Sequence, residues 1–315
     1  MTSNTQIHKN KAKPFLKWAG GKKQLLGAIS KRLPQKYKEN GVLENYVEPF
    51  VGGGALFFFL KNNFHVKKAV LYDVNRELVL AYNLIKEHHK ELIDDLKKME
   101  KEYLSKNNKE RKKYFYSIRE KYNEQRYGFD YKTYNSGWIS RTSYLIFLNK
   151  TCFNGLYRVN QKGEFNVPHG SYKNPKICDE ENLLNVNKAL QNTKIKCSDF
   201  VNSKNEIKRD AFVYLDPPYR PLNGTANFTS YSRDGFDESD QRRLAKFFKN
   251  MDKKGALLML SNSDPKNENP EDEFFDKIYE GFRIERVTAK RAISCVGSKR
   301  GEIKELIIRN YPKES

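Results

Sequence analysis

The sequence predicts an α/β fold in which helices cover both faces of a mostly parallel, doubly wound sheet. Short apolar runs of strand length alternate along the chain with helical segments. Several of these runs end in a turn that carries Gly, Asp or Pro. Because ligands of open α/β sheets bind beyond the carboxyl ends of the strands, we expect the functional site at these turns.

The length of the chain limits the number of domains, and its net charge indicates the kind of partner. The chain has 315 residues, enough for one large domain with a sizeable insertion or for two domains. Its formal net charge is +20. A surplus of this size favours a polyanionic partner, and nucleic acid leads over a membrane surface because no basic amphipathic anchor helix stands out. A highly soluble protein without such a partner is the plain alternative.

Several classes of protein are disfavoured. Residues 1–12 are polar and basic, so we expect a disordered arm rather than a secretory signal, and a protein of the cell interior. No apolar run approaches membrane length. The scattered cysteines argue against a zinc site and a disulfide framework, and we interpret His88-His89 as a solvated helix face, so we expect no metal. The cysteines are Cys152, Cys178, Cys197 and Cys295.

The first motif is a compact patch of aromatic, small and basic residues from Pro14 to Lys23, before a helix predicted over Gln24–Leu33. Gly20-Gly21 lets backbone N–H groups approach a ligand closely, and Lys22 can pair with a carboxylate. The alternative is a Gly-Gly turn beside a core tryptophan.

A strand, a tight glycine turn and a helix follow over Asn45–Leu56, which is the layout of a nucleotide-type cofactor site. The contiguous glycines 52–54 lack the Gly-x-Gly-x-x-Gly spacing, so a cofactor without phosphates is favoured. The next strand covers Val70–Asn75. Asp73 at its carboxyl end suits a ribose hydroxyl pair or, equally, a helix cap.

From Ile85 to Tyr122 the chain is charged and helical, with apolar stripes at helical spacing, and a more apolar helix is predicted over Gly137–Lys150. We interpret residues 85–189 as an insertion into an α/β core made of residues 13–84 and 190–315.

Within the insertion, Phe153–Pro168 predicts a β-hairpin that turns at Gln161–Gly163. The Arg158 fork matches the two acceptors of guanine in the major groove. Asn154 at a loop tip could wedge into a duplex, although Asn-Gly is also a plain turn signal. Alternation puts three residues on one face: Leu156, Arg158 and Asn160.

The motif Asp216-Pro217-Pro218-Tyr219 follows the apolar strand Ala211–Leu215. An amine attached to an aromatic ring is a poor nucleophile because its lone pair is delocalised. The Asp216 carboxylate and the Pro217 carbonyl can accept its two N–H hydrogen bonds and turn the lone pair outward. The prolines stiffen the loop, and Tyr219 offers a flat face to a planar base. A Pro-Pro turn with a capping Asp explains these four residues equally well.

The rest of the chain completes the core. The strand at Lys194–Phe200 ends in Asp199 and Phe200, which could bond and stack an adenine ring. A polar loop over Arg220–Asp234 carries Phe228 and Tyr231. A helix is predicted over 238–250, and strands over 256–261, 284–287 and 305–308.

Together these motifs resemble the Dam family of DNA adenine methyltransferases, in the family's order and over nearly the whole chain. They are Phe-Leu-Lys-Trp-Ala-Gly-Gly-Lys at 15–22, Glu-Pro-Phe-Val-Gly-Gly-Gly-Ala-Leu-Phe at 48–57, Leu-Asn-Lys at 148–150, Phe-Asn-Gly-Leu at 153–156, Asp-Pro-Pro-Tyr at 216–219 and Thr-Ala-Asn-Phe-Thr at 225–229. The resemblance implies a Rossmann-like S-adenosylmethionine-dependent methyltransferase sheet, with residues 85–189 as an inserted helical and β-hairpin DNA-recognition domain.

The resemblance also implies chemistry and partners. S-adenosylmethionine is the expected methyl donor, the exocyclic amine of adenine the acceptor, and GATC in double-stranded DNA the target, reached by base flipping. We expect a monomer or a weak dimer on DNA, in the bacterial cytoplasm beside the nucleoid. The enzyme would act alone or beside a cognate restriction nuclease.

The expected site residues fall into three sets. Family positions that contact the cofactor are matched by Trp18, Lys22, Asp73 and Asp216. Positions that read the target sequence are matched by Lys17, Leu156, Arg158 and Pro168. The residue that inserts beside the displaced adenine is matched by Asn154. Phe153 stands where many relatives carry Tyr. Catalysis is expected from Asp216, Pro217, Pro218 and Tyr219. Cofactor contacts are expected from Trp18, Ala19, Gly20, Gly21, Lys22, Glu48, Pro49, Phe50, Gly52, Gly54, Asp73, Asn75, Asp199, Phe200 and Asp216. DNA contacts are expected from Lys17, Phe153, Asn154, Leu156, Arg158, Asn160, Pro168, Phe228 and Tyr231.

Rival functions stay open. Methylation of RNA or of a protein amide uses the same fold, and a nicotinamide dehydrogenase is disfavoured by the contiguous glycines. A non-catalytic DNA-binding module is disfavoured by the intact Asp-Pro-Pro-Tyr motif. A cytosine ring-carbon methyltransferase needs a nucleophilic cysteine, and the sequence contains no Pro-Cys pair.

Overall fold

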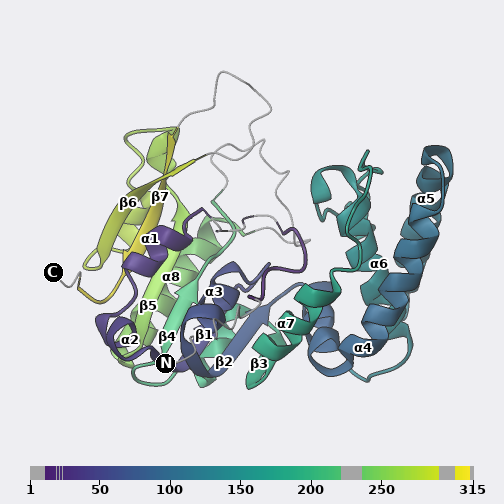
Figure 1. The fold of residues 1–315 in the computed structure, drawn as a ribbon. Helices are drawn as coiled ribbons and strands as arrows, with labels where there is room; N and C mark the ends of the chain where they lie inside the picture. Colours follow the sequence, from purple (N-terminus) through teal and green to yellow (C-terminus); the bar gives the residue numbers. More distant parts are fainter. Residues whose placement is uncertain are drawn as a thin grey trace, which may run out of the picture.

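The computed structural model describes residues 11–18, 20, 22, 24–220, 236–290 and 302–312. Its centre is a seven-stranded sheet with the order β3-β2-β1-β4-β5-β7-β6 (Figure 1). Neighbouring strands run parallel, except that β7 is antiparallel to both β5 and β6. The predicted α/β fold class is confirmed, and the reversed strand is a feature that the sequence pattern did not indicate.

The strands are β1 (Val42–Glu48), β2 (His65–Asp73), β3 (Thr193–Cys197), β4 (Phe212–Leu215), β5 (Leu257–Ser263), β6 (Arg283–Lys290) and β7 (Glu302–Arg309). The helices are α1 (Leu26–Lys31), α2 (Gln35–Asn40), α3 (Ala55–Asn63), α4 (Arg76–Leu104), α5 (Asn108–Gln125), α6 (Gly137–Thr151), α7 (Glu180–Leu190), α8 (Glu238–Lys253) and α9 (Phe274–Ile278). Of these, α2, α7 and α9 were not predicted.

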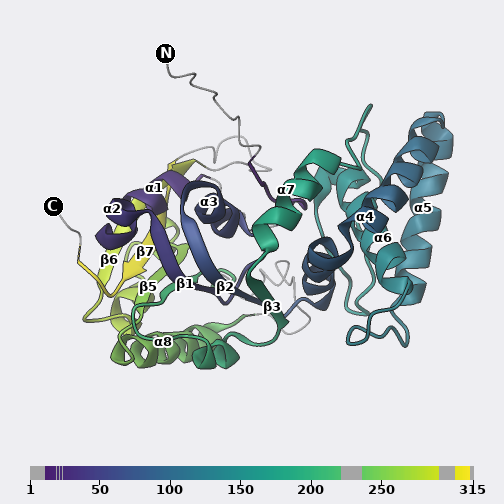
Figure 2. The ribbon, with the colours of Figure 1, turned by 60° about the horizontal axis from the view of Figure 1, so that its bottom comes forward.

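Helices cover both faces of the sheet: α1, α2 and α3 lie on one face and α8 on the other (Figure 2). Strand β4 is buried on both of its faces, which explains why its sequence is continuously apolar. Phe212 and Tyr214 pack into the core under α1–α3, whereas Val213 and Leu215 pack against α8. Because both faces of a parallel strand are buried in this way, every residue of β4 is apolar or aromatic.

The strand order creates a switch point between β1 and β4. From β1 the chain adds β2 and β3 on one side, and β4 and β5 follow on the other. The register pairs Glu48 with Leu71 and Asp73 with Cys197, so the carboxyl ends of these strands lie at one edge. A crevice forms at such an edge, and the predicted motifs meet there.

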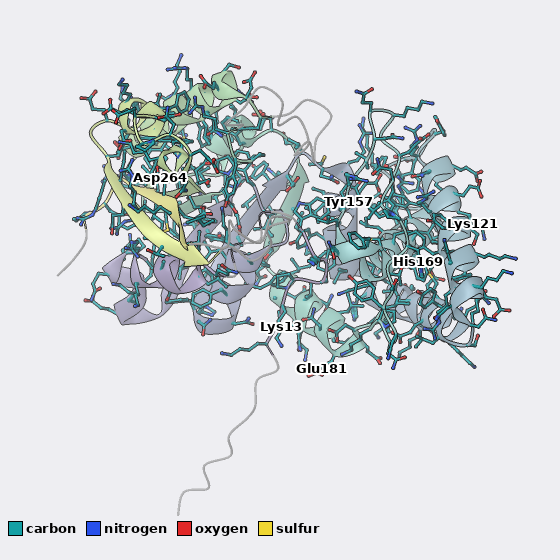
Figure 3. The ribbon with its side chains drawn as sticks, turned by 90° about the horizontal axis from the view of Figure 1, so that it is seen from above. Lys13, Lys121, Tyr157, His169, Glu181 and Asp264 are labelled. Atoms are coloured by element: carbon teal, nitrogen blue, oxygen red, sulfur yellow. The ribbon has the colours of Figure 1, made fainter. Side chains whose placement is uncertain are left out.

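The segment between β2 and β3 extends away from the sheet as α4, α5 and α6 (Figure 1). Helix α4 crosses the predicted boundary at residue 85 and bends at His88, where φ is −133° and ψ is 37°. His88 is half-buried and stacks on Tyr134 at 3.9 Å, so it is not simply a solvated residue. The predicted apolar stripes are buried except for half-buried Tyr114, and they join the core on the α3 face of the sheet. In Figure 3, Tyr157 lies at the junction of the two parts, and Lys121 and His169 lie within the helical part.

The predicted hairpin is present in a shortened form. The Asn160 N–H donates to the Glu164 carbonyl, and Val159 and Phe165 form an antiparallel bridge around the turn. The segment before it is not extended, because Phe153–Gly155 forms a 3₁₀ turn in which Asn154 has a φ of 58°.

Three further observations concern the predicted N-terminal arm, the cysteines and the apolarity of the helices. Residues 1–10 of the predicted arm lie outside the described residues, but Ala12 is buried and exchanges two backbone hydrogen bonds with the Asn62 side chain. Among the described cysteines, Cys152 and Cys178 are buried, Cys197 is exposed and all three are free. Cys295 is outside the described part. In the ranges that the structure describes, no helix has the length and apolarity to cross a membrane.

Candidate active site

A cavity of about 850 Å³ opens at the carboxyl edge of β1, β2 and β4 and extends toward Tyr157 of the insertion. It brings together most of the residues that the sequence predicted for cofactor binding and catalysis. The predicted residues that line it are Trp18, Gly20, Lys22, Glu48, Pro49, Phe50, Gly52, Gly54, Asp73, Asn75, Asp199, Phe200, Asp216, Pro217, Pro218 and Tyr219. Ala19 and Gly21 lie outside the described residues.

The glycine turn after β1 forms one wall of the cavity. Gly52 and Gly54 have φ values of 47° and 71°, which explains why glycine stands there. The Gly52 N–H donates to Asp73 Oδ2 at 3.0 Å, and the Asn75 N–H donates to Asp73 Oδ1 at 2.8 Å. Asp73 therefore fastens the end of β2 to the glycine turn. Burial raises the pKa of Asp73, although these backbone N–H groups oppose the rise.

Aromatic and charged side chains also line the cavity. Phe50 packs on Phe200 with ring centroids 5.3 Å apart. Asp199 accepts the Val201 N–H and pairs with Arg243 through both oxygens, each at 2.9 Å. Burial opposes this ionisation, but Arg243 holds the pKa of Asp199 below its ordinary value. Trp18 also lines the cavity and stacks on Tyr157, with ring centroids 4.9 Å apart.

The Asp-Pro-Pro-Tyr motif belongs to a charged cluster in which Lys22 is buried and Asp216 is half-buried. Lys22 Nζ lies 3.1 Å from Asp216 Oδ1 and donates to the Tyr219 hydroxyl at 2.6 Å. The same nitrogen is 3.5 Å from Glu305 Oε2. Ser261 of β5 donates to Asp216 Oδ1 at 3.1 Å. Three strands and the segment before α1 thus converge on this cluster.

Burial sets the proton affinity of the carboxylates at this edge. It raises the pKa of Asp216 to about 6, despite the opposing effects of Lys22 and Ser261. Burial also raises the pKa of Glu48 well above its ordinary range, although Tyr46 donates to Glu48 Oε2 at 2.7 Å. For Lys22, burial alone would lower the pKa, but Asp216, Tyr219 and Glu305 together raise it, so Lys22 stays charged.

The Asp-Pro-Pro-Tyr loop is held from the α8 side. Gln241, fully buried on α8, donates from Nε2 to the Pro218 carbonyl at 3.0 Å. Arg220, directly after the motif, pairs with Glu238 and with Asp272. These contacts fix the loop on the side opposite Lys22.

Those predicted DNA-contacting residues that the structure describes do not line the cavity. Lys17 Nζ donates to the Asn154 carbonyl at 2.5 Å, so these two are brought together. The Asn149 side chain bonds to both backbone groups of Lys17 and to the Gly155 carbonyl. The 148–150 motif therefore joins the first motif to the hairpin.

The other predicted readers differ in how free their side chains are. Arg158 is exposed, and its Nε donates to Asn166 Oδ1. The Asn160 amide is engaged with Glu164, so it stabilises the turn. Phe153 is 56% exposed, and its N–H donates to the carbonyl of exposed Pro168. Leu156 is half-buried. Phe228 and Tyr231 lie outside the described residues.

Comparison with known proteins shows the family of the chain. The family model of the D12 class N6 adenine-specific DNA methyltransferases matches residues 18–293. The chain belongs to this family. It is 49% identical to a type II methyltransferase of Methanocaldococcus jannaschii over 95% of this chain and 99% of the relative. It is 39% identical to a type II methyltransferase of Lactococcus lactis (97% and 98%) and 35% identical to a DNA adenine methylase of Haemophilus influenzae (95% and 94%).

Sequence reasoning missed several residues at or beside this candidate site. Glu305 offered one signal, a lone carboxylate next to the apolar run Leu306–Ile308. Ser261, Gln241 and Arg243 offered none, because a polar residue at a strand end or on a helix is ordinary. Among the described residues, no group of three or more His, Cys, Asp or Glu could hold a metal ion.

Gly54 of the methyltransferase gives a test of the glycine wall. A Cβ at Gly54 would lie 2.5 Å from the hydroxyl of buried Tyr82, which is fixed by its bond to the Gly52 carbonyl. Gly41 has a similar φ of 68° but nothing within 4 Å. We expect Gly41→Ala to lower the free energy of unfolding by about 1 kcal/mol and Gly54→Ala by roughly 1–3 kcal/mol more. Urea unfolding measures both, and equal losses would contradict the close-approach explanation.

Proposed function

We propose that this methyltransferase transfers a methyl group from S-adenosylmethionine to the exocyclic amine of adenine in double-stranded DNA, within GATC. The observation that carries the proposal is the half-buried Asp216 carboxylate, which lines the cavity and pairs with buried Lys22. We further propose a monomer or weak dimer on DNA, in the bacterial cytoplasm beside the nucleoid.

Asp216 and its neighbours leave two acceptors for the amine. Ser261 and Lys22 both approach Asp216 Oδ1, so Oδ2 is the oxygen better placed to accept an N–H from a ligand. Gln241 occupies the Pro218 carbonyl, which leaves the Pro217 carbonyl as the second acceptor. Two acceptors draw both amine hydrogens to one side, so the nitrogen lone pair points away from them.

The cavity wall fits S-adenosylmethionine. The glycine turn is contiguous and offers no pyrophosphate fingerprint, the Phe50–Phe200 region suits a planar adenine, and Asp73 faces the cavity as an acceptor for ribose hydroxyls. When bound, S-adenosylmethionine supplies a methyl group on a sulfonium sulfur that is itself a good leaving group. The protein then contributes mainly by positioning the methyl donor against the amine, which can lower the barrier by about 7 kcal/mol or more.

A stacked adenine cannot present its amine inside this cavity, so we propose that the target base is flipped. The Tyr219 ring is 40% exposed and offers a face for the flipped base. The net charge of +20 favours contacts to phosphates, which makes binding strongly salt-dependent. Lys17 and Arg158, on the insertion side of Trp18, are the proposed base readers.

The testing experiment uses labelled S-adenosylmethionine and two duplexes that differ only in whether they contain GATC. Labelled adenine in the GATC duplex alone is the expected result. Equal labelling would overturn the assigned target, and no labelling, or transfer to RNA or protein instead, would overturn the function. Asp216→Ala is expected to abolish transfer and to spare DNA binding, whereas Asp94→Ala, at an exposed position on α4, should change neither.

The pH dependence of transfer follows from Asp216. Its pKa of about 6 means that the carboxylate accepts hydrogen bonds above pH 6 and is protonated below it. We therefore expect kcat/KM to fall as pH falls through 6, by about tenfold per pH unit below that value. Rates measured from pH 5 to 8, with circular dichroism to check folding, test this. A flat profile over that range would contradict it.

Arg158→Ala tests the proposed reading of one base pair. We expect discrimination at a single position of GATC to fall by about 1–3 kcal/mol, because the bidentate contact to guanine is lost. Lys173→Ala removes an exposed cation of the same insertion and should affect all duplexes equally. Competition between duplexes with single substitutions measures this. Equal weakening by Arg158→Ala on every duplex would mark Arg158 as a phosphate contact.

A further inference from the structure

We infer that Glu305 is a positioning residue for methyl transfer, which holds the Tyr219 ring and Lys22 so that Asp216 stays open to the target amine. The inference rests on the role proposed for Asp216. Glu305 belongs to none of the predicted motifs and comes from β7, the strand that runs against the rest of the sheet.

The strand pattern explains how Glu305 reaches the site. In β7, Glu305 lies opposite Ser263 of β5 and Val287 of β6. Side chains alternate along a strand, so Glu305 shares a face with Ile307, which packs in the core under α1–α3. Lys22 precedes α1 and lies on this face. The Glu305 residue is only 4% exposed, and a carboxylate this deeply buried requires partners.

Both oxygens of Glu305 bind the Tyr219 hydroxyl. The hydroxyl lies 2.9 Å from Oε1 and 3.0 Å from Oε2, and it accepts from Lys22 Nζ at 2.6 Å. These contacts restrain the free end of the phenol ring, while Pro217 and Pro218 restrain the backbone before it. The orientation of the ring face offered to the base is thereby fixed. Glu305 does not line the cavity, so it acts through Tyr219 and Lys22.

Glu305 is also a second carboxylate partner of Lys22, beside Asp216. Lys22 lies between Asp216 and Glu305 and sits 4.2 Å from the centroid of the Tyr219 ring, so it covers one face of that ring. Without the Glu305 charge, Asp216 would be the remaining carboxylate partner of Lys22 among the described residues. Lys22 would then be drawn toward Asp216, where it competes with the amine for the carboxylate.

The groups around Asp216 determine which change a variant should cause. Lys22 lowers the pKa of Asp216, whereas Glu305 raises it, so loss of the Glu305 charge moves the pKa down. Among the residues that the structure describes, the ionisable groups that face Asp216 come from the segment before α1, from β1, from β4 and its loop, and from β7: Lys22, Tyr46, Glu48, Tyr214, Tyr219 and Glu305.

The test measures labelled methyl transfer to the GATC duplex from pH 5 to 8 with four variants. Glu305→Gln should lower kcat by about tenfold or more. It should also lower the pH at which the rate falls on the acid side of the profile (the acid limb), relative to the wild type. Glu305→Asp keeps the charge but shortens the reach, so it should lower kcat and leave the acid limb in place. In a Tyr219→Phe background, Glu305→Gln should cost much less, because the hydroxyl that it holds is absent.

Glu285→Gln is the matched control, since Glu285 lies on the neighbouring strand and pairs with Arg32 and Arg309 away from Asp216. It should leave the acid limb unchanged. The inference is overturned if Glu305→Gln behaves like Glu285→Gln, or if its effect adds fully to that of Tyr219→Phe. If Glu305→Gln does not fold, an acid limb displaced in Glu305→Asp overturns it. Absence of transfer by the wild type would reject the proposed function itself and the inference with it.

Discussion

The site depends on one buried cation, Lys22, which lies between Asp216 and Glu305. These three charges come from the segment before α1, from the loop after β4 and from β7. Two carboxylates brought together away from water repel each other, and Lys22 is what makes their approach tolerable. A buried pair of this kind is weak evidence for stability by itself. The ion pairs do restrain the relative positions of Lys22, Asp216 and Glu305, because a buried charge must stay close to a partner of opposite sign.

The parallel sheet supplies the rest of the constraint. Parallel strands end at the same edge, so Glu48, Asp73 and Asp216 are delivered to one cavity by register alone. All three have raised pKa values, chiefly because the edge is buried. Each is restrained by a different donor: the Tyr46 hydroxyl, the Gly52 and Asn75 N–H groups, and Lys22 with Ser261. The cavity is therefore rich in fixed acceptors, which suits ligands that carry N–H and O–H groups.

The insertion is joined to this edge by specific contacts. Glu77 follows the Asp73 turn and forms a bidentate pair with Arg141 of α6, and Arg141 Nη1 also donates to the Tyr122 carbonyl at 3.0 Å. Trp18 stacks on Tyr157, and Asn149 binds the Lys17 backbone. The proposed base readers are thus held in a fixed relation to the cavity wall. In the proposed function, this connection would relate the reading of the sequence to the position of the base at Asp216.

The fold class, the main strands, the glycine turn and the Asp-Pro-Pro-Tyr motif could be predicted from the sequence, because these depend on local pattern: apolar runs of strand length, turn residues and the spacing of motifs. The sequence also indicated the hairpin turn, but not the 3₁₀ turn at Phe153–Gly155 or the engagement of Asn160 with Glu164. Only the tertiary structure decided the reversal of β7, and with it the position of Glu305 beside Tyr219. The physical reason is that strand order and the partners of a buried charge depend on residues far apart in the chain, 86 positions in this case, and no local pattern records them.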